Sequence, residues 1–322
     1  INDLHVAFPT DDGMVRAVDG VSLTVSQGET VAIVGESGSG KTVTSLSVMG
    51  LHKKGSAQMS GAISVAHDGG FLDVITASEE EIRSMRGRSV AMIFQDPMSA
   101  LHPYYKIGAQ LAEAYLVHNP GKKKEAAARA VEMLDLVGIS EPAQRAKEFP
   151  HQFSGGMRQR VMIAMSIACN PKLLFADEPT TALDVTVQAQ VLELLADLRR
   201  DMGMAMVIVT HDLGVVAGYT DRIAVMYGGE IVELATTTDL FANTKMPYTE
   251  ALMNAIPRID RKRGSSLAAI EGMPPDPTTN HTGCAFAARC PYAQQKCHDQ
   301  HPELVDAGNG HLYRCFFPIG GK

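Results

Sequence analysis

The chain has 322 residues, of which 45% are hydrophobic and 20% are charged, a balance typical of a folded globular protein. At roughly 100–200 residues per domain, this length predicts one large domain and one small one, or two domains of modest size. The formal net charge of −7 argues against a nucleic-acid partner, because nucleic-acid-binding domains usually carry a basic excess.

The sequence lacks a run approaching the roughly 20 apolar residues that cross a bilayer, and it opens without the pattern of a signal peptide. We therefore expect the chain in the cytosol, with any attachment to a membrane made through partner subunits.

Short strands are predicted at the start of the chain. Hydrophobic residues alternate over residues 4–8 and 21–25, and residues 30–34 form a continuous apolar run. Alternation is typical of half-buried β-strands, and a short apolar run is typical of fully buried ones. Residues 56–77 are predicted to form a short β insertion. Ser78 and Glu81 then form a capping box that starts a short helix.

Helices and strands alternate further along. Helices are predicted within residues 97–169 and over 186–202, and strands over 90–94, 172–176, 204–209, 222–226 and 231–234. This alternation favours an α/β fold with a mainly parallel sheet and a helical insert. A charged stretch, residues 258–266, precedes several prolines and is the predicted linker to a cysteine-rich tail.

The strongest motif is GESGSGKT, from Gly35 to Thr42. It matches the phosphate-binding pattern G-x-x-x-x-G-K-[ST] between a predicted strand and a predicted helix. Gly38 and Gly40 let backbone N–H groups face phosphate oxygens, and the following helix directs its positive end toward them. Lys41 can reach the β- and γ-phosphates, and the Thr42 hydroxyl can bind Mg²⁺. The flanking elements argue against a chance glycine-rich turn.

Two adjacent acids end the apolar strand that starts near Lys172. In a nucleotide site, Asp177 would hold Mg²⁺ through its water shell, and Glu178 would orient and deprotonate the attacking water. Alone, the pair would be interpreted as a solvated strand-to-loop junction. The phosphate loop elsewhere in the chain favours the catalytic interpretation.

A second phosphate-facing helix start is predicted at Ser154, a favourable N-cap followed by Gly155 and Gly156. One chain rarely needs two such sites. Two chains arranged head to tail do, since each ATP would then lie between the loop of one chain and the Ser-Gly-Gly of the other.

In this order, the motifs resemble those of the ATP-binding subunits of ABC transporters, over about residues 1–234. The matching segments are Gly35–Thr42 (Walker A), Gln95 (Q-loop), Ser154–Gln159 (signature, with Met157 where glutamine is commonest), Leu173–Asp177 (Walker B), Ala182–Asp184 (D-loop) and His211 (switch histidine). The resemblance implies a P-loop NTPase fold of ABC type. Its parts would be a mainly parallel core, an antiparallel β subdomain and a helical subdomain at about 97–169.

The resemblance also implies roles for single residues. Glu178, His211 and Gln95 form the expected catalytic set, and Thr42, Gln95 and Asp177 the expected magnesium set. His211 considered alone would be a hydrogen-bonded loop histidine. The expected nucleotide-binding residues are Phe8, Gly35, Glu36, Ser37, Gly38, Ser39, Gly40, Lys41, Thr42, Ser154, Gly155, Gly156, Asp177 and Asp184. Phe8 would stack on adenine, and a plain core phenylalanine is the alternative.

The tail resembles the C-terminal extension of dipeptide, oligopeptide and nickel importer ATPases. The resemblance rests on Pro247-Tyr-Thr249, with Met246 where many members have histidine, and on the run Gly283–Pro291. It is closest to the first of the two ATPases in such systems. We therefore expect an ATPase domain over residues 1–235 and an extension over residues 236–322.

Four cysteines of the extension, Cys284, Cys290, Cys297 and Cys315, are separated by five, six and seventeen residues. Thiolates of this kind can hold zinc or an iron–sulfur cluster, and none of the gaps has C-x-x-C spacing. The resemblance implies a four-iron four-sulfur cluster, while zinc and free thiols stay open. A structural role is expected for the metal, because a short tail rich in proline and glycine has little core. Cys169 is predicted to be an inert buried thiol.

The resemblance implies partners as well. They are a second ATPase subunit, expected to be a paralogue, two transmembrane permease subunits and, indirectly, an extracytoplasmic peptide-binding protein, with no nucleic acid. The chain would lie peripherally on the cytoplasmic face of the cell membrane. It would hydrolyse ATP to power import of di- or oligopeptides. Nickel, an antimicrobial peptide or an exported drug are alternative cargoes. A non-transport ABC protein fits poorly with one cassette and an acidic balance.

Overall fold

The structure is a computed structural model that describes residues 1–320 apart from positions 12, 54, 97–99, 182–183, 257–269 and 280–281. The predicted linker at 258–266 and part of the expected D-loop lie outside these described residues. The chain divides into two compact units. The first comprises residues 1–24, 30–63 and 209–322, and the second comprises residues 25–29 and 64–208. Within the described parts, no helix has the length and apolar character required for a membrane span.

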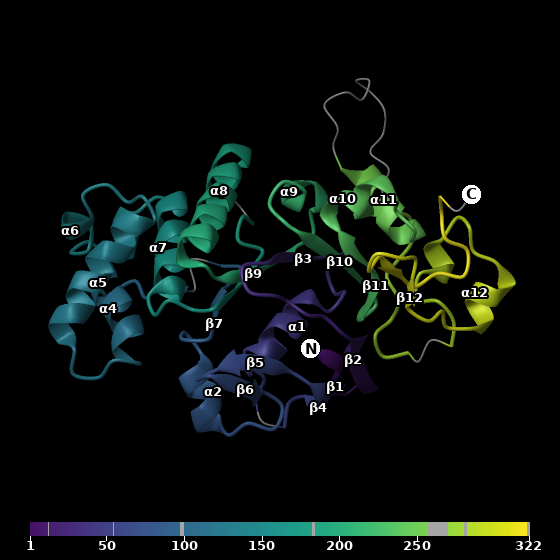
Figure 1. Ribbon diagram of the computed structural model, residues 1–322, viewed down its shortest axis with the longest axis horizontal. Coiled ribbons are helices and arrows are strands. Elements are labelled where there is room, and N and C mark those ends of the chain that lie inside the picture. The colour runs from purple at the N-terminus through teal and green to yellow at the C-terminus, as the bar shows by residue number, and fades with distance from the viewer. Residues whose placement is uncertain are drawn as a thin grey trace. The chain divides into compact units, whose positions relative to one another are not determined.

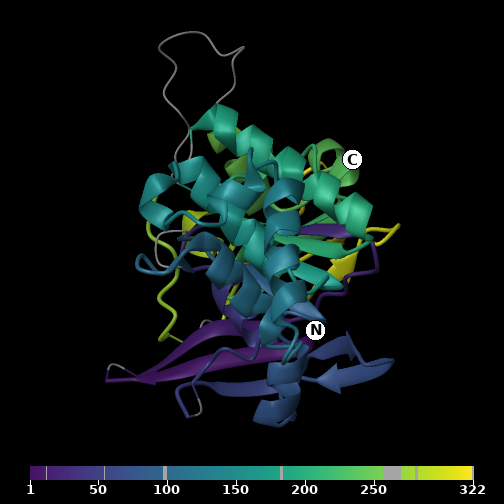
Figure 2. The same cartoon turned by 90° about the vertical axis from the view of Figure 1, so that its left-hand side faces the viewer.

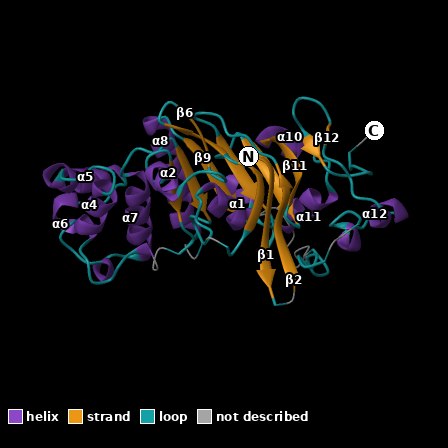
Figure 3. Cartoon of the chain, turned by 90° about the horizontal axis from the view of Figure 1, so that it is seen from below, coloured by secondary structure: helices purple, strands orange, loops and turns teal. Residues whose placement is uncertain are grey.

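An antiparallel sheet opens the first unit. Strand β1 (Asn2–Thr10) lies between β2 (Gly13–Val21) and β4 (Gln58–Ala62), and β1 and β2 form a long hairpin (Figures 2 and 3). Leu4 and Val6 of β1 are fully buried. Their burial on alternate positions fixes the register of the sheet, because a slip of one residue would expose both.

The strand expected over residues 21–25 is absent. Strand β2 ends at Val21, and residues 22–29 contain neither helix nor strand. Leu23 is buried, and its backbone N–H and carbonyl bond to Ile1. The alternation therefore reflects the burial of Val21 and Leu23 rather than a continuous ladder.

Five further strands of this unit are paired in the order β12-β13-β11-β10-β3. Strand β3 (Thr30–Val34), buried at every position, runs parallel to β10 (Arg222–Tyr227). Strand β11 (Glu230–Thr236) is antiparallel to β10 and joins the tail strands β13 (Leu312–Tyr313) and β12 (Val305–Asp306). The helices are α1 (Lys41–Val48), α9 (Leu213–Val216), α10 (Thr237–Ala242), α11 (Pro247–Ala255), the short η2 (Ala287–Arg289) and α12 (Gln295–Asp299).

The second unit contains the expected helical insert. Helices α4 (Ile107–Leu116), α5 (Lys123–Leu136) and α7 (Gly155–Ile167) lie side by side (Figure 1). The strand order is β9-β8-β7, and the bounds are β7 (Val90–Ile93), β8 (Leu173–Asp177) and β9 (Ala205–Thr210). The other elements that the structure describes in this unit are β5 (Ser64–His67), β6 (Gly70–Asp73), α2 (Glu79–Met85), α6 (Pro142–Arg145), η1 (Pro150–Gln152) and α8 (Val185–Met202).

Candidate functional site

The glycine-rich loop connects β3 to α1 in the first unit. Gly38 and Gly40 have φ angles of 80° and 100°, a region that L side chains rarely adopt. A Cβ atom on Gly40 would lie 2.4 Å from the carbonyl oxygen of Ala17, and one on Gly35 would lie 2.2 Å from that of Met226. The loop therefore requires glycine for its conformation and for its close contact with β2 and β10.

Lys41, the first residue of α1, is buried. Its Nζ donates hydrogen bonds to the carbonyl oxygens of Gly35 at 2.7 Å and Glu36 at 2.8 Å, so the ammonium folds back across the loop. Gly40 supplies no side-chain cap to α1. An ammonium group beside an uncapped helix start is an arrangement suited to anions.

Glu178 follows β8 in the second unit, directly after the buried Asp177. Its φ angle of 46° is unusual for a residue other than glycine. Gln95 Nε2 donates to Glu178 Oε2 at 2.7 Å, and the Thr181 hydroxyl donates to the same oxygen at 2.8 Å. The structure thus brings together two residues of the expected catalytic set, and it adds Thr181.

Two motif residues act as helix caps in this unit. The Ser154 hydroxyl accepts a hydrogen bond from the N–H of Met157 at the start of α7. The Asp184 carboxylate accepts the N–H groups of Thr186 and Val187 at the start of α8. A Cβ on Gly156 would approach Val187 to 3.3 Å, so the glycine allows α7 to lie close to α8.

Phe8 and His211 belong to the first unit. Phe8 is half-buried on β1 and meets His52 edge to face, with ring centroids 5.5 Å apart. Burial lowers the pKa of His52. His211 follows β9 and is exposed. Phe8 is therefore not fully buried, as it would be if it were only a core phenylalanine.

Contacts from the tail to the phosphate loop were not predicted from the sequence. Arg289 of η2 forms two hydrogen bonds with the Glu36 carboxylate, at 2.6 and 3.0 Å. The backbone N–H of Glu36 also donates to the Tyr248 hydroxyl at 2.9 Å. The available signal was an arginine directly before Cys290, and no spacing rule connects it to a loop more than 250 residues away.

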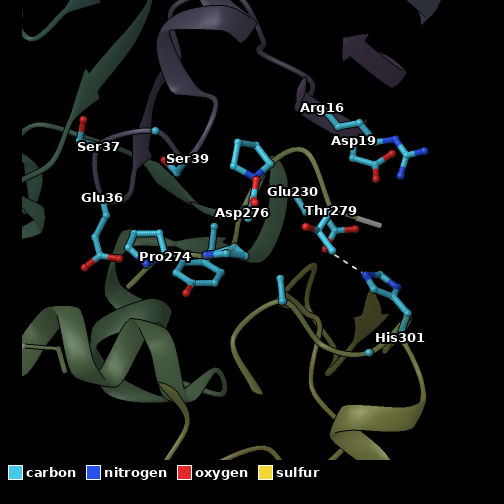
Figure 4. A pocket seen from close by; sticks show the side chains of 17 residues that line it. Arg16, Asp19, Glu36, Ser37, Ser39, Glu230, Pro274, Asp276, Thr279 and His301 are labelled. Carbon is cyan, nitrogen blue, oxygen red and sulfur yellow. Dashed lines mark hydrogen bonds and ion pairs between the residues drawn. The ribbon is translucent and has the colours of Figure 1, made fainter. Parts of the chain in front are cut away.

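A pocket opens between the loop and residues 274–279. Figure 4 shows Glu36, Ser37 and Ser39 on one side and Pro274 and Asp276 nearby. The segment is tied to β2 by a hydrogen bond from the N–H of Arg16 to the carbonyl oxygen of Pro277 at 2.9 Å. On another wall, His301 bonds Glu230 at 3.0 Å. Residues of the tail therefore form one side of a pocket whose other side is the phosphate loop.

The four tail cysteines, Cys284, Cys290, Cys297 and Cys315, line one apolar cavity together with Phe286, Phe316 and Phe317. Burial raises the pKa of Cys284 to about 11 and also raises the pKa of Cys290 and Cys315. In the part of the chain that the structure describes, no three His, Cys, Asp or Glu side chains are arranged to hold a single metal ion. Cys169 is half-buried and donates to the carbonyl oxygen of Ala114 at 3.5 Å.

Two protein families match the sequence in consecutive segments. Residues 18–181 match the family described as ABC transporter. Residues 232–297 match the family described as the C-terminal region of oligopeptide/dipeptide transporters. The first match contains the phosphate loop and the acid pair, and the second contains three of the four tail cysteines.

Curated relatives cover nearly the whole chain. The dipeptide transport ATP-binding protein DppD of Bacillus subtilis (strain 168) is 47% identical over 320 residues, covering 98% of this chain and 93% of its own. The oligopeptide transport ATP-binding protein AppD of the same organism is 50% identical over 317 residues, covering 98% and 95%. OppD of Salmonella typhimurium is 45% identical over 319 residues, covering 99% and 93%.

Solved structures resemble the chain as well. A dimeric bacterial ABC transporter cassette superposes with a TM-score of 0.63 at 28% identity, over 73% of this chain and 97% of the cassette. A dimeric post-hydrolysis state of an ATP-binding cassette bound to ADP and Pi gives 0.62 at 27% identity, over 73% and 97%.

Proposed function

The chain belongs to the ABC transporter family, among the ATP-binding subunits of oligopeptide and dipeptide transport, and from this premise we propose that it hydrolyses ATP to drive peptide import. The P-loop fold and the family together make it an ABC-type ATPase. The observation that carries the proposal is the preformed phosphate loop, in which Gly38 and Gly40 hold left-handed backbone and Lys41 spans the loop. Peptide as cargo follows from the names of the relatives.

The phosphate loop is the proposed site for the triphosphate. Backbone N–H groups from Gly38 to Lys41 would cradle phosphate oxygens, and the Lys41 ammonium would exchange its carbonyl partners for the β- and γ-phosphates. Thr42, whose side chain is exposed, is a proposed magnesium ligand with Asp177. Phe8 is proposed to stack on adenine, and its half-exposed ring supports this.

Glu178 is the proposed general base. Its carboxylate would orient and deprotonate the attacking water, and hydrogen bonds from Gln95 and Thr181 hold one of its oxygens in this structure. Gln95 is proposed to sense the metal or the water, and His211 to contact the γ-phosphate. The strained backbone at Glu178 supports a functional role, since such strain is concentrated at active sites.

A second ATPase subunit is the proposed partner across the nucleotide. Ser154, Gly155 and Gly156 would present the start of α7 to the partner's ATP, and Asp184 would lie near the same boundary. Two solved cassettes that resemble this chain are described as dimers, which supports this arrangement. Two permease subunits would then hold the pair at the cytoplasmic face of the membrane.

We also propose that Cys284, Cys290, Cys297 and Cys315 hold a four-iron four-sulfur cluster. Their convergence on one cavity with an aromatic wall supports the fit. The cluster would cross-link a segment that has little regular structure. Anaerobically purified protein is expected to contain about four irons per chain, with visible absorption that bleaches on reduction. One zinc per chain without colour would replace this proposal by a zinc site.

ATP binding by the full-length chain tests the nucleotide site. We expect saturable binding of ATP with Mg²⁺ in the wild type and its loss in Lys41→Ala, because the variant removes the cation of the loop. Lys245→Ala, which removes a lysine outside the phosphate loop, is the matched control and should bind as the wild type does. Equal binding by Lys41→Ala and the wild type would contradict the assignment.

A further inference from the structure

One of the residues by which the extension contacts the phosphate loop is an arginine, and all of its N–H donors are hydrogen-bonded. Arg289 Nη1 bonds Glu36 Oε2 at 2.6 Å and the Tyr227 hydroxyl at 3.2 Å. Its Nη2 bonds Glu36 Oε1 at 3.0 Å and the carbonyl oxygen of Ile270 at 3.0 Å. Its Nε donates to the carbonyl oxygen of Glu271 at 3.0 Å. These five bonds match the five N–H donors of a guanidinium group.

From this geometry we propose that Arg289 and Tyr248 of the extension are positioning residues of the ATP site, and that Arg289 neutralises the Glu36 carboxylate beside the bound triphosphate. The inference rests on the proposed function, since it requires that the loop bind ATP. Both residues, and the loop itself, belong to the first compact unit.

Burial gives the pair its strength. The Arg289 side chain is 4% exposed and that of Glu36 is 27% exposed. Ion pairs that are withdrawn from water are screened less than surface pairs, and removing one partner leaves the other with an uncompensated charge. Two parallel N–H···O bonds also fix direction, so Glu36 is held toward the extension.

Tyr248 fixes the backbone of the same residue. Its hydroxyl accepts the Glu36 N–H, and its ring is fully buried. It packs against Tyr227 and Phe286, with centroids 4.5 and 5.3 Å away. Phe286 is also a wall of the cysteine cavity. A contiguous set of contacts therefore runs from the cysteines to the loop.

Charge explains why the loop needs this arginine. Glu36 is the second residue of the phosphate loop, and an uncompensated carboxylate there would repel a triphosphate. Repulsion between like charges falls with distance and with solvent screening. Arg289, which bonds both carboxylate oxygens of Glu36, cancels this charge and holds the carboxylate toward the extension. Lysine has no planar fork and cannot make the same five bonds.

The test is a charge rescue measured as the Kd for a fluorescent ATP analogue on the full-length chain. Arg289→Gln is expected to raise the Kd about tenfold, with a smaller rise for the ADP analogue, because ATP carries more negative charge. Adding Glu36→Gln to this variant is expected to restore most of the affinity. An arginine that only stabilises the fold of the extension would give no rescue.

Further variants keep the proposal testable if Arg289→Gln does not fold. Arg289→Lys, which keeps the charge, should weaken binding less than Arg289→Gln. Tyr248→Phe keeps the ring and should raise the Kd a few fold. Unchanged affinity in Arg289→Gln, or weakened affinity without rescue, would overturn the proposal. Absence of binding by the wild type would instead contradict the proposed function.

Discussion

Thr181 shares the carboxylate of Glu178 with Gln95. Both donors bond to Oε2, at 2.8 and 2.7 Å, and so help to hold the proposed base in one orientation. The local backbone at Glu178 is left-handed, which makes the orientation of its side chain depend on these neighbours.

Thr181→Val should therefore slow hydrolysis without weakening ATP binding. Valine keeps the shape of threonine and removes one donor, a change of about 1 kcal/mol, which corresponds to a fall in kcat of about fivefold. Steady-state kinetics of the assembled ATPase would separate kcat from KM. Thr186→Val, at an exposed position of α8, is the matched control. A rise in KM with kcat unchanged would contradict this role for Thr181.

Among the elements, β11 is joined to the tail by a buried polar triad. His311 bonds Glu233 of β11 and Asp239 of α10, each at 2.8 Å, and Glu233 also accepts the N–H groups of Lys245 and Met246 before α11. Glu233 is fully buried. One histidine therefore connects the tail to the sheet, to α10 and to the start of α11.

His311→Leu should lower the free energy of unfolding by about 3 kcal/mol, because it removes a hydrogen-bond partner of the buried Glu233 carboxylate. Urea unfolding measures this, with the exposed His298→Leu as control. Equal midpoints for the two variants would contradict it.

Acid should weaken the same connection. Hydrogen bonds from Asn243 and then His311 lower the pKa of Asp239 below its ordinary value of 3.8. A carboxyl group with a lowered pKa stabilises the folded state at neutral pH, and this contribution is lost as the pH falls through its folded pKa. Asp239→Asn should therefore make the unfolding free energy less dependent on pH below about pH 4.

Local patterns predicted most elements well. The helical insert, the buried strands and the Ser78 capping box are present, with ends shifted by one or two residues. The prediction of a strand at 21–25 was wrong, because the burial of Leu23 outside a sheet produces the same alternation of hydrophobic residues as a hydrogen-bonded strand does. The triad and the Arg289 contact could not be predicted, since each joins residues far apart in sequence whose partners are set by the packing of the tail.

On the scale of the whole molecule, the family match assigns the domain with the phosphate loop and the C-terminal extension to one kind of protein, an ATP-binding subunit of peptide transport. The phosphate loop, the acid pair and the extension all lie in one chain whose relatives are peptide-transport ATP-binding proteins. The motif order made the ABC family and its fold predictable from sequence. The roles of single site residues, the cluster and the partner subunits stay as predictions.

Peptide uptake by the assembled transporter tests the central claim most directly. In vesicles that contain this chain, its partner ATPase, the permeases and the peptide-binding protein, we expect ATP on the side of this chain to drive accumulation of a labelled dipeptide. Glu178→Gln should still bind ATP and should lower uptake at least about tenfold, since it removes the proposed general base. Uptake equal to that of the wild type in this variant would contradict the account.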